Sequence, residues 1–232
     1  MSISVCVYCR EGIILASDSR LTLTNSQVEN SVMYSDNTTK TFLAKQIGIS
    51  FTGDSDIEGV HISKFINNFI DENITVDTCV STVPQLLINY FNKLKTSLQI
   101  TFFVAGYLKT TKEQVLYTIY LKTGEIAQTD TKGGGASWHG DPSDILNKLL
   151  IPVYQQQVVN GKLSYTRLAD HLIPFDHFNM QDSIDFAVHC VSTVEKTIRF
   201  QTRQQSVGGP IDVLVIKPGE AFWVYKKELH IK

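Results

Sequence analysis

The sequence is poor in cysteine. Only four of its 232 residues are cysteine, fewer than a disulfide-stabilised scaffold of this length usually carries. Cys6 and Cys9 have the C-x-x-C spacing of redox and zinc motifs. They lie in a segment with strand character, however, where side chains three apart point to opposite faces. We therefore expect a reduced, cytoplasmic protein without a disulfide framework.

A basic patch and a long apolar run are also missing. The net charge is −2, with 21 basic and 23 acidic residues, which argues against nucleic acid or an anionic membrane as a partner. No stretch approaches the roughly 18 consecutive apolar residues of a transmembrane helix. The N-terminus has no basic region followed by a long apolar one, so we expect no cleaved signal peptide and a chain that starts at Met1 or Ser2.

Motifs for cofactors and metals are absent as well. The triple glycine at 133–135 lacks the Lys-Ser/Thr of a phosphate-binding loop. The six histidines form no H-E-x-x-H motif, and no second cysteine pair completes a zinc site. We expect neither a cofactor nor a metal ion.

What is present is ordinary globular material, with 43% apolar and 19% charged residues, sufficient for one domain that spans 1–232. The order is strands, two helices, strands, helices and strands, which favours an α+β fold with helices packed on sheets. A polar stretch at 18–36 predicts a long loop. The expected strands cover 2–8, 13–16, 41–43, 46–51, 100–108, 114–121, 126–131, 211–216 and 221–225, and the expected helices cover 54–69, 80–95, 141–159, 163–172 and 180–200.

The first quarter of the chain carries a family resemblance. A strand begins at the second residue, and the next strand ends in Asp18-Ser19-Arg20. Lys40 follows, and a further strand ends in Gly53. This order is similar to the opening of a proteasome β-type subunit.

A second segment resembles one branch of that family. Residues 206–212, with the sequence Ser-Val-Gly-Gly-Pro-Ile-Asp, follow an expected helix. Together with Thr-Ile-Arg at 197–199, they are similar to the C-terminal helix and strand of the bacterial Anbu proteins. The piece at 16–20 is also closer to Anbu than to other proteasome subunits.

The resemblance implies a fold, an assembly and a set of site residues. The fold is the four-layer αββα sandwich of the N-terminal-nucleophile hydrolases, and the chain is expected to assemble with itself into a ring or an open spiral. Ser2 stands where the family has its nucleophilic Thr. The resemblance makes Asp18, Lys40 and Gly53 the other catalytic positions and gives supporting roles to two further residues, Arg20 and Ser137.

The chemistry of such a site can be stated from the residue types. A free α-amine has a pKa of about 7.7–8.0, so an N-terminal residue can use its own amine as the general base for its side-chain hydroxyl. A cation at Lys40, oriented by Asp18, lowers the pKa of the amine and stabilises an alkoxide. The Gly53 N–H is the expected oxyanion donor. The expected reaction is cleavage of a peptide or amide through an acyl ester on Ser2, after removal of Met1.

Each of these residues also has an ordinary structural interpretation. Ser at position two suits removal of the initiator Met, Lys40 fits a solvated charge, and Gly53 fits the end of a strand. The family's Gly-Ser-Gly with its supporting serine is replaced by Gly at 133–135, for which Ser137 is the available substitute. The alternative is therefore a non-catalytic assembly subunit of the same fold that retains Met1.

Overall fold

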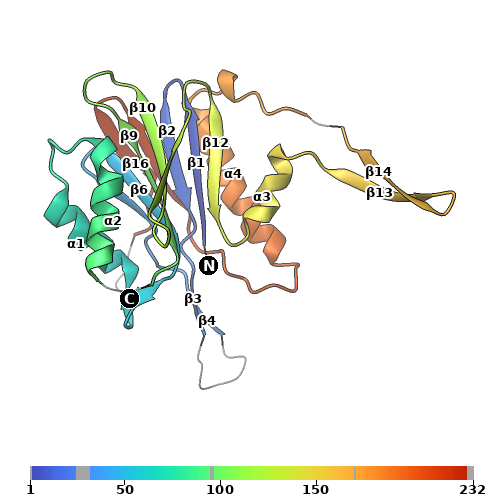
Figure 1. Ribbon diagram of the computed structural model, residues 1–232, viewed down its shortest axis with the longest axis horizontal. Coiled ribbons are helices and arrows are strands. Elements are labelled where there is room, and N and C mark those ends of the chain that lie inside the picture. The colour runs from blue at the N-terminus through green and yellow to red at the C-terminus, as the bar shows by residue number, and fades with distance from the viewer. Residues whose placement is uncertain (1, 25–31, 95–96, 170, 229–232) are drawn as a thin grey trace.

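The computed structural model describes residues 2–24, 32–94, 97–169 and 171–228. Two five-stranded sheets dominate it, and every strand pair in them is antiparallel (Figure 1). The first sheet has the order β12 (Gly135–Gly140), β1 (Ile3–Cys9), β2 (Gly12–Ser17), β15 (Asp212–Lys217) and β16 (Glu220–Tyr225). The second has the order β11 (Glu125–Thr129), β10 (Gln114–Tyr120), β9 (Ile100–Tyr107), β6 (Ile47–Gly53) and β5 (Thr41–Ala44).

Three short hairpins and four α-helices complete the described residues. The hairpins pair β3 (Leu21–Thr24) with β4 (Val32–Ser35), β7 (Asp56–Ile57) with β8 (Val60–His61), and β13 (Tyr154–Val159) with β14 (Lys162–Arg167). The helices are α1 (Ile62–Asn73), α2 (Val83–Lys93), α3 (Ser143–Leu150) and α4 (Met180–Ile198), with 3₁₀ turns at Val80–Thr82 and Phe175–His177.

The apolar side chains gather in three clusters that account for the packing. One cluster lies between the two sheets and includes Cys6, Leu15 and Phe103. A second joins the first sheet to α3 and α4, and a third joins the second sheet to α1 and α2. Side chains alternate along a strand, so in β1 the residues at 3, 5 and 7 face the helices while Cys6 faces the other sheet. The fold is α+β, as the order of elements predicts.

Most elements lie where the sequence predicts them, including the first and last hairpins and the helix at 180–200. The loop expected at 18–36 is wrong, because β3 and β4 lie in it; residues 25–31 fall outside the described part. The helix expected from 54 begins only at Ile62. Before it, Glu58 and Gly59 have positive φ angles of 51° and 78°, which turn the chain into the β7–β8 hairpin.

The largest correction concerns the region that follows α3. A helix was expected over 141–159, with a further short helix at 163–172, but α3 ends at Leu150. Asn160 and Gly161 have φ angles of 52° and 75°, and this left-handed pair closes the β13–β14 hairpin. Asn-Gly between two strands is a strong hairpin signal, and here it outweighs the helical pattern expected on either side of it. Strand β12 was also missed, since the glycines at 133–135 give no strand pattern.

Candidate functional site

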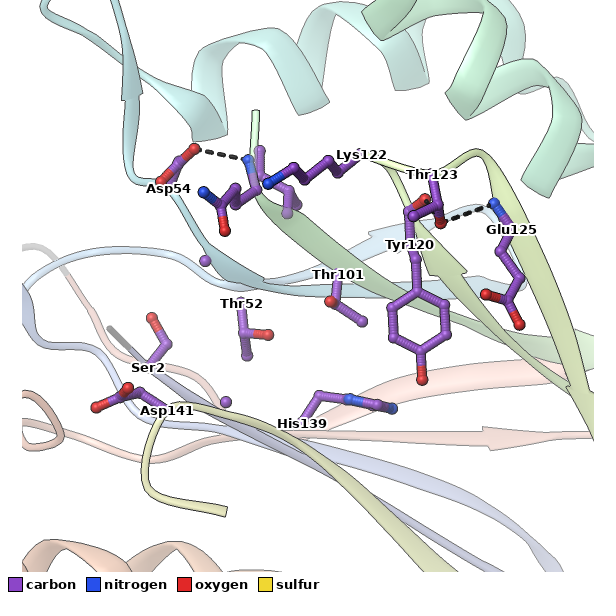
Figure 2. A pocket seen from close by; sticks show the side chains of 14 residues that line it. Ser2, Thr52, Asp54, Thr101, Tyr120, Lys122, Thr123, Glu125, His139 and Asp141 are labelled. Carbon is purple, nitrogen blue, oxygen red and sulfur yellow. Dashed lines mark hydrogen bonds between the residues drawn. The ribbon is translucent and has the colours of Figure 1, made fainter. Parts of the chain in front are cut away.

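Ser2 lies at the start of β1 and at the wall of a cavity of about 720 Å³. The cavity opens where the ends of the two sheets meet, and Figure 2 shows Ser2 and Thr52 on its walls. Both side chains come from buried residues, each 4% exposed. Neither hydroxyl has a hydrogen-bond partner among the described residues. A volume of this size is typical of small-molecule and peptide-binding sites.

Asp18 and Lys40 form a buried ion pair directly behind Ser2. The Lys40 Nζ donates to Asp18 Oδ1 at 2.8 Å and Oδ2 at 2.9 Å, and to the carbonyl oxygen of Arg20 at 2.6 Å. The side chains are only 2% and 1% exposed. Asp18 Oδ1 also accepts from the backbone N–H of Ile3 at 3.1 Å. The pair therefore fixes the backbone one residue after Ser2.

The hydrogen bonds of Lys40 define how it can act. An ammonium has three donors, and here three acceptors on Asp18 and Arg20 surround it. Burial is the main influence on the pKa of Lys40 and lowers it, while the attraction of Asp18 opposes that effect. The donors of Lys40 are therefore occupied by Asp18 and Arg20, and none of its hydrogen bonds reaches Ser2 in the described residues.

Two glycines with positive φ angles flank Ser2. Gly53 has φ 116° and Gly140 has φ 142°. A Cβ atom would lie 2.0 Å from the carbonyl oxygen of Gln99 in the first case and 2.0 Å from that of Ser2 in the second. Any side chain at either position would clash with backbone, so the close approach of the strands at the cavity requires glycine there.

The Gly53 N–H points away from β9. Phe51 N–H donates to the carbonyl oxygen of Lys40 at 3.0 Å, while Asp54 N–H donates to that of Gln99 at 3.1 Å. Successive amides of a strand alternate between its two edges, so Gly53 N–H lies on the same edge as Phe51 N–H. The β5–β6 pairing register ends at Thr41 and Ser50, before it reaches Gly53.

The two supporting residues have different surroundings. Arg20 makes a two-pronged ion pair with Asp36 at 2.7 and 2.8 Å, and it lies against Gly208. Ser137 on β12 lies opposite Cys6 of β1, whereas the residue of β12 opposite Ile3 is Gly140. Ser137 is therefore roughly 10 Å along the strand from the Ser2 end, and it does not line the cavity. Thus Asp18, Lys40 and Gly53 come together near Ser2, and Ser137 does not.

Sequence reasoning missed a chain of buried hydroxyls beneath the site. The Oγ atoms of Ser4 and Ser50 are 2.6 Å apart, Thr41 Oγ1 donates to Ser50 Oγ at 3.2 Å, and Ser17 Oγ is 2.8 Å from Thr41 Oγ1. Ser4 and Ser17 belong to the first sheet, and the other two belong to the second. These bonds fix the distance between the sheets directly below Ser2. The alternation of small polar residues with Ile3, Val5 and Val7 is the sequence signal that could have predicted the part of this hydroxyl chain that lies on β1.

A second buried ion pair supports the first. Lys227 pairs with Asp212 and donates to Ser19 Oγ at 3.0 Å. Ser19 N–H in turn donates to the carbonyl oxygen of Gly208, whose own N–H donates to Asp18 Oδ2 at 3.2 Å. The segment after β16 is thereby connected to the Asp18–Lys40 pair, and the positive charge of Lys227 contributes to the lowered pKa of Lys40.

The remaining cavity wall also escaped sequence reasoning. It includes Tyr120, His139 and Asp141 (Figure 2). The ring of His139 lies 5.0 Å from that of Phe103 and 5.6 Å from that of Tyr120, by ring centroids. Burial lowers the pKa of His139, so this imidazole is neutral at pH 7. Since β12 was not recognised, nothing in the sequence placed His139 beside Ser2.

Comparison with known proteins adds no relative. No family model matches the chain, and no curated protein matches it. Among the described residues, no group of His, Cys, Asp and Glu side chains is arranged to hold a metal ion. In the same residues, none of the helices combines the length and apolar character needed to cross a membrane. All four cysteines are free thiols.

Proposed function

We propose that the protein is a proteasome-like N-terminal-nucleophile hydrolase that cleaves peptide or amide bonds through an acyl ester on Ser2. The observation that carries the proposal is the placement of Ser2. Its hydroxyl lines the large cavity, while the next residue is held by the buried Asp18–Lys40 pair. A solvated Lys40, the ordinary alternative, does not fit a side chain that is 2% exposed.

The proposed reaction begins when Met1 is removed and the α-amine of Ser2 is free. Ser2 Oγ attacks the substrate carbonyl carbon, and its proton passes to the α-amine. The negative charge on the carbonyl oxygen is accepted by the Gly53 N–H. When the C–N bond breaks, the proton moves from the α-ammonium to the leaving nitrogen. A water molecule, deprotonated by the same amine, then attacks the ester carbonyl carbon, and the α-ammonium returns that proton to Ser2 Oγ as the acyl C–Oγ bond breaks.

Lys40 and Asp18 have positioning and electrostatic roles in this scheme. A nearby cation lowers the pKa of an amine, which keeps it neutral and basic near pH 7. Asp18 holds that cation and, through Ile3 N–H, the backbone next to the nucleophile. Arg20 supplies the carbonyl that completes the coordination of Lys40.

The finer fold assignment belongs to the same proposal. Two facing sheets with helices on the outer side of each fit the four-layer αββα sandwich of the N-terminal-nucleophile hydrolases. In that arrangement the chain is one domain over 1–232. The free thiols fit a reducing compartment such as the cytoplasm.

Self-assembly is the second part of the proposal. The β13–β14 hairpin, which we call the arm, projects from the body in Figure 1. Its residues are all exposed, and an isolated two-stranded hairpin is marginally stable in water. Contacts with neighbouring copies in a ring or an open spiral would cover it.

One alternative function has an observation in its favour. Ser137 is far from Ser2, so the supporting serine of the family has no replacement at that position, while the exposed arm suits an assembly role. A non-catalytic subunit that retains Met1 would use the same fold and arm. It would leave the cavity beside Ser2 without a chemical purpose.

A peptidase assay on the purified full-length chain separates the two candidates. Unstructured casein and a mixed peptide pool serve as substrates, with Ser2→Ala and Ser2→Thr as matched variants. The hydrolase proposal predicts activity in the wild type, activity retained in Ser2→Thr, and loss of at least a hundredfold in Ser2→Ala. No turnover by either wild type or Ser2→Ala would favour the assembly subunit, and equal turnover by both would show that Ser2 is not the nucleophile.

A further inference from the structure

The cavity beside Ser2 has more acidic than basic groups around it. Three carboxylates line it, from Asp54, Glu125 and Asp141, against the single ammonium of Lys122. They come from three different places in the chain, namely the ends of β6 and β12 and the start of β11 (Figure 2). The four side chains sum to a charge of −2. The whole chain has that same net charge spread over 232 residues, so negative charge is concentrated at this opening.

The carboxylates are largely free to interact with a ligand. Asp54 Oδ2 accepts from the backbone N–H of Gln99 at 2.7 Å, which fixes its orientation. Within the described residues, the carboxylates of Glu125 and Asp141 have neither a hydrogen bond nor an ion pair, although Asp141 is close enough to Arg203 to interact with its charge. An acidic group without a partner at the mouth of a cavity attracts cations and raises their local concentration.

The inner wall gives an independent sign that the cavity is built for an occupant. Ser2 and Thr52 are each only 4% exposed, and their side chains line the cavity without a hydrogen-bond partner in the described part of the chain. Their hydroxyl oxygens are accessible from the cavity, unlike the buried and unpaired Oγ atom of Ser206. A ligand that enters this cavity can therefore bond to both hydroxyls.

The side wall favours a cation with an apolar stem. The rings of Tyr120 and His139 meet at 83° in an edge-to-face contact. Because the pKa of His139 is lowered by burial, the imidazole is neutral at pH 7 and adds no repulsion. Aromatic faces attract ammonium and guanidinium groups, and the methylenes of Lys or Arg pack against such rings.

We propose that this cavity binds a Lys or Arg side chain of the peptide substrate, with the cation directed to Glu125 beside the Tyr120 ring and with Asp141 adding negative charge at the Ser2 end (Figure 2). The inference rests on the proposed function of Ser2 and names its substrate class. Because the carboxylates are exposed, the preference is moderate and depends on salt.

Binding can be tested without catalysis in the full-length Ser2→Ala variant. The probes are acetylated and amidated peptides Ala-Ala-X-Ala-Ala in which X is Lys, Gln or Glu, followed by saturation-transfer NMR titration. We expect the Lys peptide to bind about fivefold more tightly than the Gln peptide, and the Glu peptide to bind most weakly. The difference should shrink in 0.5 M NaCl.

Variants separate the cavity from the overall charge. Glu125→Gln with Asp141→Asn should abolish the Lys preference, and Lys122→Gln should increase it. Asp71→Asn with Glu72→Gln removes two exposed charges on α1 and serves as the matched control, which should leave the preference unchanged. An equal loss in the control, or equal binding of all three peptides, would overturn the inference.

The test distinguishes this inference from the function it rests on. Preferential binding of the Lys peptide, together with a wild-type chain that cleaves no peptide, keeps the cation site and removes the hydrolase. Cleavage of Lys, Gln and Glu peptides at equal kcat/KM keeps the hydrolase and removes the cation site. If Ser2→Ala fails to fold, the same titrations on wild type at 4 °C, with substrate integrity followed by mass spectrometry, give the answer.

Discussion

The first hairpin and the arm have the same secondary structure and opposite surroundings. The β1–β2 hairpin and the β13–β14 hairpin are both antiparallel pairs of about the same length, each closed by two residues. Every residue of β1 and β2 is buried, and every residue of β13 and β14 is exposed. Strand pairing is therefore a local property, whereas burial depends on what covers each face.

The difference lies in the neighbours of each hairpin. Strand β1 has α3 and α4 on one face and the second sheet on the other. In the arm, Tyr154, Val158, Leu163 and Tyr165 share one face by strand alternation, and they are 56–69% exposed. An apolar face without a covering layer is expected of an interface rather than of a domain core.

The largest effect is expected from the ion pair behind β1. Asp18→Ala leaves the Lys40 ammonium buried without its partner and should cost about 3–5 kcal/mol of stability. Asp36→Ala breaks the Arg20–Asp36 pair, which is more exposed than the Asp18–Lys40 pair. This change should cost less than about 1 kcal/mol of stability. Urea denaturation followed by circular dichroism measures both. Similar losses for the two variants would mean that the Asp18–Lys40 pair is not buried as described.

A matched substitution compares the two hairpins directly. Val5 on β1 is 0% exposed and Val158 in the arm is 69% exposed. Val5→Ala should destabilise the chain by about 2 kcal/mol because it leaves a cavity under α4. Val158→Ala should change the stability by less than about 0.5 kcal/mol when the chain is dilute and monomeric. Thermal and urea unfolding at low concentration check this, and equal effects would erase the distinction between the hairpins.

Alkaline pH provides a further test of whether water is excluded from the side chains of β1. Burial raises the pKa of Cys6, so the folded chain keeps this thiol protonated, while an unfolded thiol titrates at about 8.5. A group with a raised folded pKa stabilises the fold below its unfolded pKa and loses that contribution as the pH rises. Each such buried thiol should lower the free energy of unfolding by about 1 kcal/mol between pH 8 and 9.5.

The cysteines themselves supply the control for that titration. Cys6→Ala should flatten the fall between pH 8 and 9.5, although burial also raises the pKa of Cys190 to about 12 and leaves part of the slope. Cys79 is partly exposed, and its bond with Ser81 lowers its pKa, so Cys79→Ala should leave the fall as steep as in wild type. A slope unaffected by Cys6→Ala would place that thiol in water.

Removal of the arm should have the smallest effect on the body. Leu168 N–H bonds to the carbonyl oxygen of Val153 at 2.8 Å and closes the base of the arm. Replacing 154–167 by a short Gly-Ser linker should change the unfolding free energy by less than about 0.5 kcal/mol. The assembly proposal predicts that the same deletion reduces the oligomer to smaller species in light scattering. An unfolded body would contradict the prediction on stability, and an unchanged oligomer would contradict the prediction on assembly.

The same two regions show what the sequence can and cannot predict. The sequence predicts the first hairpin because Ile3, Val5 and Val7 alternate with other residues, and the resemblance places Asp18 and Lys40 in register. The sequence predicts a helix over the first strand of the arm because the Gln and Val residues of 155–159 fit either period. Both strands are exposed throughout, so no buried face distinguishes a strand from a helix there. The hydroxyl of Thr52 and the ring of His139 come from different sheets and line the same cavity. Their proximity depends on how the sheets pack, so no local sequence pattern predicts it.

The nucleophile is tested most directly by labelling. Intact mass of the purified chain shows whether Met1 has been removed, and an acylating probe that requires a free α-amine is then added to wild type and to Ser2→Ala. The account predicts a mass without Met1, one adduct per wild-type chain located at Ser2, and none on Ser2→Ala. Met1 retained in the cell with no adduct on Ser2 would contradict it.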